Sequence, residues 1–227
     1  MLERRYLFPH VIEMNYQARR RLGVNVFLID GGDEFLLIDI GYEDTVDEIV
    51  ELIRQMDFSL STCKMIIATH ADADHVQGLR RAAEIFKASV ASHPAAFEPL
   101  ESGDEIMTFA TIKAQQFQIP MPRCKVDLKL NEGDVIEVGS QRLEVWHTPG
   151  HTEGQLSFKL NNLLFSGDNI YKESCVGAID DHHGSDLEAF IESLQRIRND
   201  DSEFLLPSHG FVFRRDNSII DAAIKRL

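Results

Sequence analysis

Histidine and aspartate residues gather at four places in the sequence, each directly after a short apolar run. Residues 69–75 (THADADH) follow the apolar run 65–68, and His151 lies in the segment HTPGHT. Asp168 closes the segment FSGD, and His209 lies in LPSHG. Imidazole nitrogens and carboxylate oxygens are the donors that transition metals take in proteins. A loop at a strand end can aim several side chains at one point while the strand and the next element hold it rigid.

Each of these residues alone is most simply explained as a helix cap, a turn residue or a satisfied polar group. The ordered set is much harder to explain in that way. We therefore interpret the set as metal donors, and no Ser/His/Asp or Cys/His nucleophile stands out beside it. The candidate donors are His70, Asp72, Asp74, His75, His151, Asp168 and His209.

The elements that must position these donors are mostly short strands. In the first half, runs 24–29 and 35–40 flank the turn residues DGGD and predict a hairpin. Helical spacing of apolar residues predicts helices over 46–56 and 75–86, with the strand 65–68 between them. The segment 98–123 has weak periodicity and is interpreted as a connection that covers a site.

The second half repeats this mixture of strands and helices. Strands are expected over 135–138, 143–146, 156–160, 163–165 and 204–206, with helices over 187–197 and 218–227. The dipeptides GS and NN join two of the strand pairs as hairpins. Two clusters of strands with helices near each predict an α/β (α+β) fold with two sheets face to face. No linker divides the chain, so residues 1–227 are expected to form a single domain.

Composition excludes several classes of function. With 37 acidic and 23 basic residues, the formal net charge is −14, which disfavours nucleic acid as a partner. No apolar run approaches the roughly 20 residues of a membrane span, and the N-terminal residues lack a secretory signal. A cytoplasmic protein with a small-molecule substrate is therefore expected. The three widely separated cysteines argue against a disulfide framework.

The motifs resemble those of the metallo-β-lactamase superfamily over nearly the whole chain. The family's HxHxDH signature is matched by HADADH at 70–75, and its TPGHT element by residues 148–152. Its SGD element matches 166–168, its PxHG element matches 207–210, and its LIDTG strand resembles LIDIG at 37–41. The resemblance implies an αββα sandwich, the metallo-β-lactamase fold, with metals in a cleft between the sheet edges.

The same resemblance implies a dinuclear site. By position in the motifs, His70, residue 72 and His151 would bind the first metal, and Asp74, His75 and His209 the second. Asp168 would bridge the two ions.

The chain departs from the signature at Asp72, where most members have a second histidine. A carboxylate is a harder donor than imidazole and shifts preference from zinc toward iron or manganese. The flavodiiron branch resembles this chain in having a carboxylate there, as HxExDH. The expected cofactors are thus two divalent transition-metal ions, zinc or, favoured by Asp72, iron or manganese.

The expected activity is hydrolysis of a small ester, lactone or thioester by a metal-bridged hydroxide. Asp168 would hold the ions at the required distance, and Asp74 would orient the nucleophile. Tyr171 resembles a tyrosine that contacts the substrate carbonyl in the family's lactonases, although packing beside the site is an equal alternative. The segment 109–121 supplies apolar residues that suit an acyl group or ordinary packing.

Three other functions stay open at the level of sequence. They are phosphodiester hydrolysis, a di-iron redox role, and a non-catalytic metal-binding sensor. The remaining histidines are interpreted as packed or exposed, with His147 beside the donors and His93 at the surface. His182 and His183 are assigned to an exposed polar loop, with an approach to the substrate as the alternative. The sequence does not predict the oligomeric state.

Overall fold

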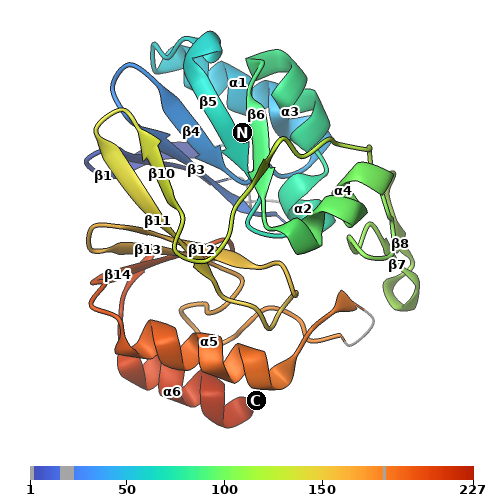
Figure 1. Ribbon diagram of the computed structural model, residues 1–227, viewed down its shortest axis with the longest axis vertical. Coiled ribbons are helices and arrows are strands. Elements are labelled where there is room, and N and C mark those ends of the chain that lie inside the picture. Colours follow the sequence, from blue (N-terminus) through green and yellow to red (C-terminus); the bar gives the residue numbers. More distant parts are fainter. Residues whose placement is uncertain (1–2, 16–22, 181–182) are drawn as a thin grey trace.

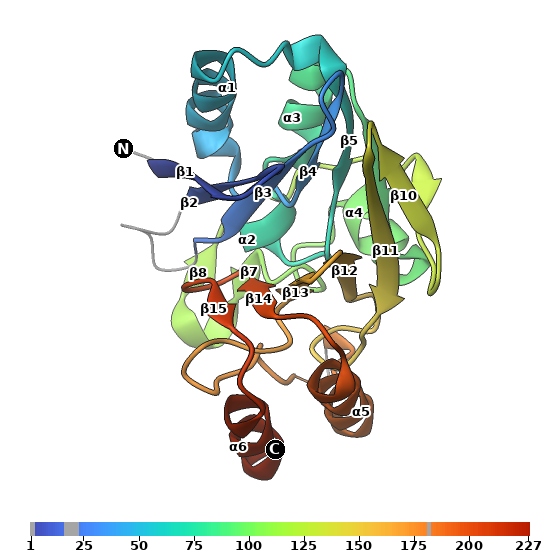
Figure 2. The same cartoon turned by 90° about the vertical axis from the view of Figure 1, so that its left-hand side faces the viewer.

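Two β-sheets lie face to face between two layers of helices (Figure 1). The computed structural model describes residues 3–15, 23–180 and 183–227. Helices α1 (Val46–Gln55) and α3 (Leu79–Phe86) cover one sheet, and α5 (Leu187–Asn199) and α6 (Asn217–Arg226) cover the other (Figure 2). The expected αββα sandwich is therefore confirmed.

The first sheet contains, in spatial order, β1-β2-β3-β4-β5-β6-β9 among the described residues. The first four strands are antiparallel, and β4, β5, β6 and β9 are parallel. The strands are β1 (Glu3–Phe8), β2 (Val11–Asn15), β3 (Asn25–Asp30), β4 (Phe35–Ile38), β5 (Cys63–Ile67), β6 (Ser89–Ser92) and β9 (Leu128–Lys129).

The second sheet runs β10-β11-β12-β13-β14-β15 in the described part of the chain, with β13 and β14 parallel and the other pairs antiparallel. Its strands are β10 (Val135–Val138), β11 (Gln141–His147), β12 (Leu156–Leu160), β13 (Leu163–Gly167), β14 (Phe204–Pro207) and β15 (Phe213–Arg214). The GS and NN hairpins are both confirmed.

Three hydrophobic clusters fill the three interfaces between the four layers. Strand β4 shows how one apolar run serves two of them, because successive side chains of a strand point to opposite faces. Phe35 and Leu37 pack toward α1 and α3, whereas Leu36 and Ile38 pack toward the second sheet. The third cluster joins the second sheet to α5 and α6, with Phe190 at its centre.

The sequence-based expectation of one continuous helix over 75–86 was wrong. A short helix, α2 (Ala73–Val76), is separated from α3 by Gln77 and Gly78. The Gly78 N–H donates to the carbonyl of Gly41 at 2.8 Å, outside the helix. A Cβ at position 78 would lie 2.7 Å from the Val46 side chain, so the close approach to α1 requires glycine here.

The connection 98–123 is more ordered than its weak periodicity indicated. It holds α4 (Phe97–Ser102) and a two-stranded hairpin of β7 (Thr111–Ile112) and β8 (Phe117–Gln118). This hairpin lies beside the sheet edge where the candidate donors are found. None of the helices in the described part of the chain combines the length and apolar character that crossing a membrane requires.

Candidate metal centre

The structure brings all seven predicted donors to one edge of the sandwich. The donors of residues 70–75 follow β5, and Asp168 and His209 follow β13 and β14. Strand β5 is parallel to β4, and β13 is parallel to β14. Parallel strands place their carboxyl ends at the same edge, so the loops that follow them can converge. His151 joins them from the loop between β11 and β12.

Among the described residues, three sets of these side chains bring their ligand atoms within 4.8 Å of one another. One set, His70, His75 and Asp168, takes a histidine from each of the other two, which share no residue and are called the two donor groups. The first group is His70, Asp72 and His151, and the second is Asp74, His75 and His209. These are the groupings that the family resemblance implied. Their roles as ligands remain a proposal.

Asp168 faces both groups. Its Oδ2 lies 3.8 Å from His151 Nε2 in the first group and 3.3 Å from His209 Nε2 in the second. Its Oδ1 lies 3.5 Å from His75 Nε2. A carboxylate in this position can contact an ion in each group, which is the geometry that bridging requires.

Hydrogen bonds fix the orientation of each histidine ring. All four rings have an oxygen within hydrogen-bond distance of Nδ1, which leaves Nε2 facing the centre. The oxygens are Thr69 Oγ1 at 3.0 Å from His70, the Asp39 carboxylate at 2.9 Å from His75, the Ala178 carbonyl at 2.6 Å from His151, and the Gly23 carbonyl at 2.8 Å from His209. Such outer partners are typical of metal-binding histidines.

Several polar atoms at the centre have no hydrogen-bond partner. Within the described residues, His70 Nε2, His75 Nε2 and Asp168 Oδ1 are buried and unpaired. A buried polar group without a partner costs about 1–3 kcal/mol. Cations coordinated at these atoms would remove that cost and offset the charge of the buried carboxylates. The donor set therefore fits two divalent transition-metal ions.

Two of the three donor carboxylates, Asp168 and Asp72, are held in the ionised form that ligation needs, whereas burial raises the pKa of the third, Asp74. Burial opposes ionisation of Asp168, but the nearby imidazoles of His209 and His75 outweigh it and hold its pKa well below the ordinary value. In the same way His70 and His151 hold the pKa of Asp72 well below its ordinary value despite burial.

Five of the seven donors line a cavity of about 450 Å³: Asp72, Asp74, His151, Asp168 and His209. Its walls are largely apolar and aromatic, and part of them comes from the β7–β8 hairpin. The wall residues include Tyr42, Phe109, Ile112, Phe117, Tyr171, Val176 and Ile179.

A glycine permits the close packing that positions His151. Gly150 has a φ of +139°, and a Cβ there would lie 2.3 Å from the Cα of Phe190 in α5. The loop can therefore press against α5 only with glycine before the histidine. This explains in physical terms why the TPGHT segment has its glycine at that point.

Two sequence-based interpretations of the other histidines hold in part. His147 stacks on His93 at a centroid distance of 4.2 Å and directs Nε2 to the carbonyl of Glu153, away from the donor groups. It is thus a packed residue, as expected. His93 is half-buried rather than exposed and accepts a hydrogen bond from the Ala95 N–H.

The interpretation of His183 as an exposed residue was wrong. Its side chain is buried, with its Nε2 2.5 Å from Asp72 Oδ1. A polar loop composition indicates exposure, but burial in a loop depends on tertiary partners such as Phe109, whose ring centroid lies 3.8 Å away. His182 lies outside the described residues.

The sequence did not predict the roles of two residues at the site, Asp39 and Tyr42. Asp39 is buried and accepts hydrogen bonds from Thr69 and His75. Its only sequence signal is its place in LIDIG, at the end of a buried strand. Tyr42 follows that strand and lines the cavity, with no motif to indicate it.

Comparison with known proteins defines the class. The family model of the metallo-beta-lactamase superfamily matches residues 19–209, and this chain belongs to that superfamily. It is a metal-dependent hydrolase.

Among named relatives, the chain is 27% identical over 188 residues to the "Probable polyketide biosynthesis zinc-dependent hydrolase PksB" of Bacillus subtilis, covering 82% of this chain and 72% of the relative. It is 28% identical over 228 residues to the acyl-coenzyme A thioesterase MBLAC2 of Homo sapiens, covering 88% of this chain and 77% of the relative.

Solved structures agree with this class. The crystal structure of TTHA1623 in a di-iron-bound form is similar with a TM-score of 0.72 and 26% identity, covering 92% of this chain and 97% of that one. The metallo-beta-lactamase family protein TTHA1429 from Thermus thermophilus has a TM-score of 0.80 at 20% identity, covering 97% of this chain and 80% of that one.

Proposed function

We propose that this hydrolase acts on an uncharged acyl ester, lactone or thioester. The observation that carries the proposal is the pairing of two donor groups with a largely apolar cavity directly above them. Two divalent ions, when bound, supply Lewis acidity and a water of lowered pKa. The chain's own residues then hold the substrate, exclude water and hold protons at defined atoms.

The proposed protein groups around the reacting carbonyl are Asp74 and Tyr171. Both side chains line the cavity that contains the donors. The Asp74 carboxylate lies 3.4 Å from His209 Nε2 and lines the cavity, where it would orient an attacking water. Burial, followed by the negative charge of Asp168, raises the pKa of Tyr171 well above its ordinary value, so its phenol keeps the proton needed to donate.

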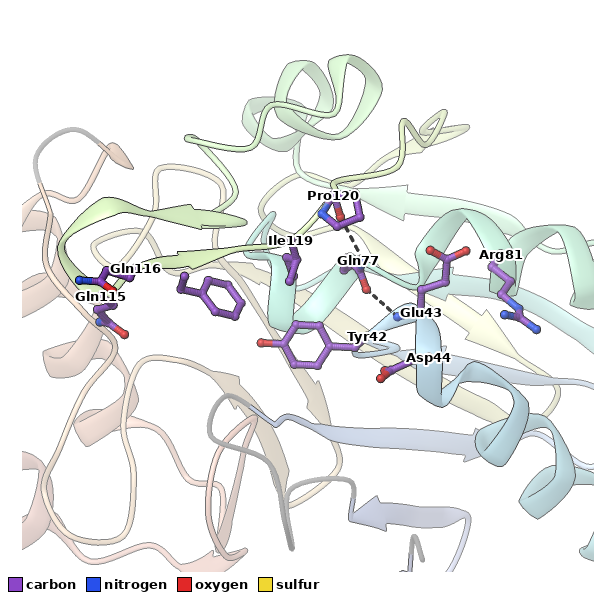
Figure 3. A pocket seen from close by; sticks show the side chains of 10 residues that line it. Tyr42, Glu43, Asp44, Gln77, Arg81, Gln115, Gln116, Ile119 and Pro120 are labelled. Carbon is purple, nitrogen blue, oxygen red and sulfur yellow. Dashed lines mark hydrogen bonds between the residues drawn. The ribbon is translucent and has the colours of Figure 1, made fainter.

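A second cavity extends the first and suits the remainder of the substrate. Its volume is about 800 Å³, and it shares Tyr42, Gln115 and Phe117 with the cavity that the donors line. Figure 3 shows the Tyr42 ring across the middle of this space, with Ile119 and Pro120 above it. Gln77 fixes the wall by accepting from the Glu43 N–H at 2.7 Å and donating to the Pro120 carbonyl at 3.0 Å.

Charge at this second cavity favours an uncharged chain over a phosphate. Arg81 is the cation among the described residues that line it, and its guanidinium is already bonded to both carboxylate oxygens of Asp47, at 2.7 and 2.8 Å. Glu43 and Asp44 add negative charge at the rim. A phosphodiester would meet repulsion there, whereas an acyl chain would pack on Phe117, Ile119 and Pro120.

A substrate panel tests this proposal. Hydrolysis by the metal-loaded protein would be measured on three kinds of substrate: acyl thioesters of a small uncharged thiol, aliphatic lactones and an aryl phosphodiester. We expect the acyl substrates to be fastest, with kcat/KM rising at least about tenfold as the acyl chain grows from two to eight carbons. Each buried methylene contributes about 0.8 kcal/mol, roughly a factor of four, so partial burial is sufficient.

The variant Phe117→Ala should flatten this dependence on acyl length, because it removes one of the two aromatic rings shared by the two cavities. Val135→Ala is a matched control, since Val135 is an exposed apolar residue on β10. A preference for the phosphodiester, or the same length dependence in Phe117→Ala, would contradict the proposal.

Replacing Tyr171 with phenylalanine should lower kcat with little change in KM. The variant keeps the ring, which packs edge-on to His209 at a centroid distance of 5.6 Å, and removes only the donor. Because a metal would share the developing charge, we expect a loss on the order of tenfold, about 1.4 kcal/mol. Steady-state kinetics and metal analysis check this, and the metal content should not change. Wild-type kinetics would assign Tyr171 to packing instead.

A further inference from the structure

The carboxylate of Asp72 is held differently at its two oxygens. Oδ2 faces the first donor group, 3.1 Å from His151 Nε2 and 3.6 Å from His70 Nε2. Oδ1 lies 2.5 Å from His183 Nε2, outside that group. Since a carboxylate only accepts hydrogen bonds, the proton must be on the imidazole.

His183 is a buried ring with one polar contact. Its side chain is 3% exposed, and within the described residues its Nδ1 has no hydrogen-bond partner. The ring lies against Phe109, with centroids 3.8 Å apart. Nothing except the bond to Asp72 therefore satisfies the polar atoms of this imidazole. Because buried polar groups are normally hydrogen-bonded, the bond to Asp72 is the simplest explanation for a histidine buried in this loop.

The loop that carries His183 is tied to the metal site through the side-chain hydroxyl of Ser185. Ser185 donates its hydroxyl to the His151 carbonyl at 2.6 Å and accepts from the Asp180 N–H at 3.0 Å. The His183 N–H donates to the Asp180 carbonyl at 2.9 Å. The position of the His183 ring is therefore coupled to the position of His151, a donor of the same group as Asp72.

We propose that His183 is a positioning residue that makes Asp72 a one-oxygen ligand. An imidazole presents a single lone pair to a metal, whereas a free carboxylate can rotate or bind through both oxygens. With Oδ1 held by His183, only Oδ2 faces the first group. The pair of Asp72 and His183 thus replaces the second histidine of the HxHxDH signature. The inference rests on metal binding at the proposed groups and not on any substrate.

Zinc retention tests the proposal without measuring activity. The zinc-loaded protein would be exposed to a competing chelator, and the loss of each ion would be followed with time and chelator concentration. In His183→Phe, which keeps a ring against Phe109 but has no donor, we expect one of the two ions to be held about 10–100-fold more weakly. His183→Gln should restore most of the retention, because its amide can donate to Oδ1.

A double-mutant cycle separates positioning from general packing. Asp72→His introduces the usual imidazole, which has no second ligand oxygen to restrain. Adding His183→Phe in that background should change zinc retention by less than about threefold. Thermal unfolding of every variant monitors the fold, and the glutamine variant keeps the test valid if the phenylalanine variant is unstable.

Three results would overturn the proposal. They are unchanged zinc retention in His183→Phe, an equal loss in the wild-type and Asp72→His backgrounds, and a wild-type protein that binds no zinc. A wild-type protein that holds two zinc ions but hydrolyses no member of the substrate panel would overturn only the proposed function.

Discussion

Replacing Asp168 with alanine should remove at least one of the bound metal ions and nearly all hydrolytic activity. Asp168 faces both donor groups, with Oδ2 3.3 Å from His209 Nε2 and 3.8 Å from His151 Nε2. Metal Lewis acidity is worth several kcal/mol, so we expect kcat/KM to fall by at least about 10³, equivalent to about 4 kcal/mol. The wild-type protein, prepared without chelators, should hold about two ions per chain and the variant about one or fewer.

Elemental analysis and kinetics on the best substrate of the panel check this prediction. Asp127→Ala is a suitable control, because Asp127 pairs with Lys125 at 2.7 Å on the surface and belongs to neither donor group. Asp168→Asn keeps the size of the side chain and serves if the alanine variant is unstable. Only trace metal in active wild-type protein, or full metal content in both Asp168→Ala and Asp168→Asn, would contradict the bridging role.

Replacing Asp39 with alanine should weaken both metal groups at once and destabilise the fold. Asp39 accepts from His75 Nδ1 at 2.9 Å and from the Thr69 hydroxyl at 2.9 Å. That hydroxyl lies 3.0 Å from His70 Nδ1, so one carboxylate orients a histidine in each group. Loss of such an outer partner costs about 10–100-fold in metal affinity.

The same substitution leaves buried donors without an acceptor. The Thr69 N–H also donates to Asp39, at 2.8 Å. An unpaired buried group costs about 1–3 kcal/mol, so we expect the free energy of unfolding to fall by about 3–5 kcal/mol, measured by denaturant titration. Part of this is backbone strain, because Asp39 has a φ of +59°.

Asp57→Ala is the matched control for that strain. Asp57 also has a positive φ, of +63°, but it is exposed. Its replacement should cost only about 1 kcal/mol and leave metal binding unchanged, because alanine at a left-handed position is strained in both variants. If Asp39→Ala were no less stable than Asp57→Ala and bound metal equally well, Asp39 would not have the orienting role described here.

Much of the architecture could be predicted because local patterns and tertiary packing agree. Apolar runs on either side of turn residues predicted the hairpin of β3 and β4, and helical spacing of apolar residues predicted the helices α1 and α5. The break at Gly78 was missed, because it depends on the approach of residues 41–46 from another part of the chain. Strands β1 and β2 were also missed.

The candidate donors could be selected from residue type and position, and the structure brings them together, whereas the residues that support them could not be predicted. His70 and His151 stand at strand ends in recognisable segments. Asp39, Tyr42 and His183 act through neighbours that the fold brings from distant parts of the sequence. Burial of loop residues follows no periodicity in the sequence. The sequence therefore does not indicate which loop residues are buried until their partners in the fold are known.

Each donor group takes side chains from both halves of the sandwich. His70 and Asp72 follow a strand of the first sheet, and His151 lies in a loop between two strands of the second. Asp74 and His75 are likewise completed by His209, which follows β14 of the second sheet. A half-folded chain can therefore present only incomplete, low-affinity sets of donors. Tight capture of metal must wait until the two sheets have docked, so ion loading reports the completion of folding. Once bound, the ions link residues of the two sheets and oppose separation of the sheets.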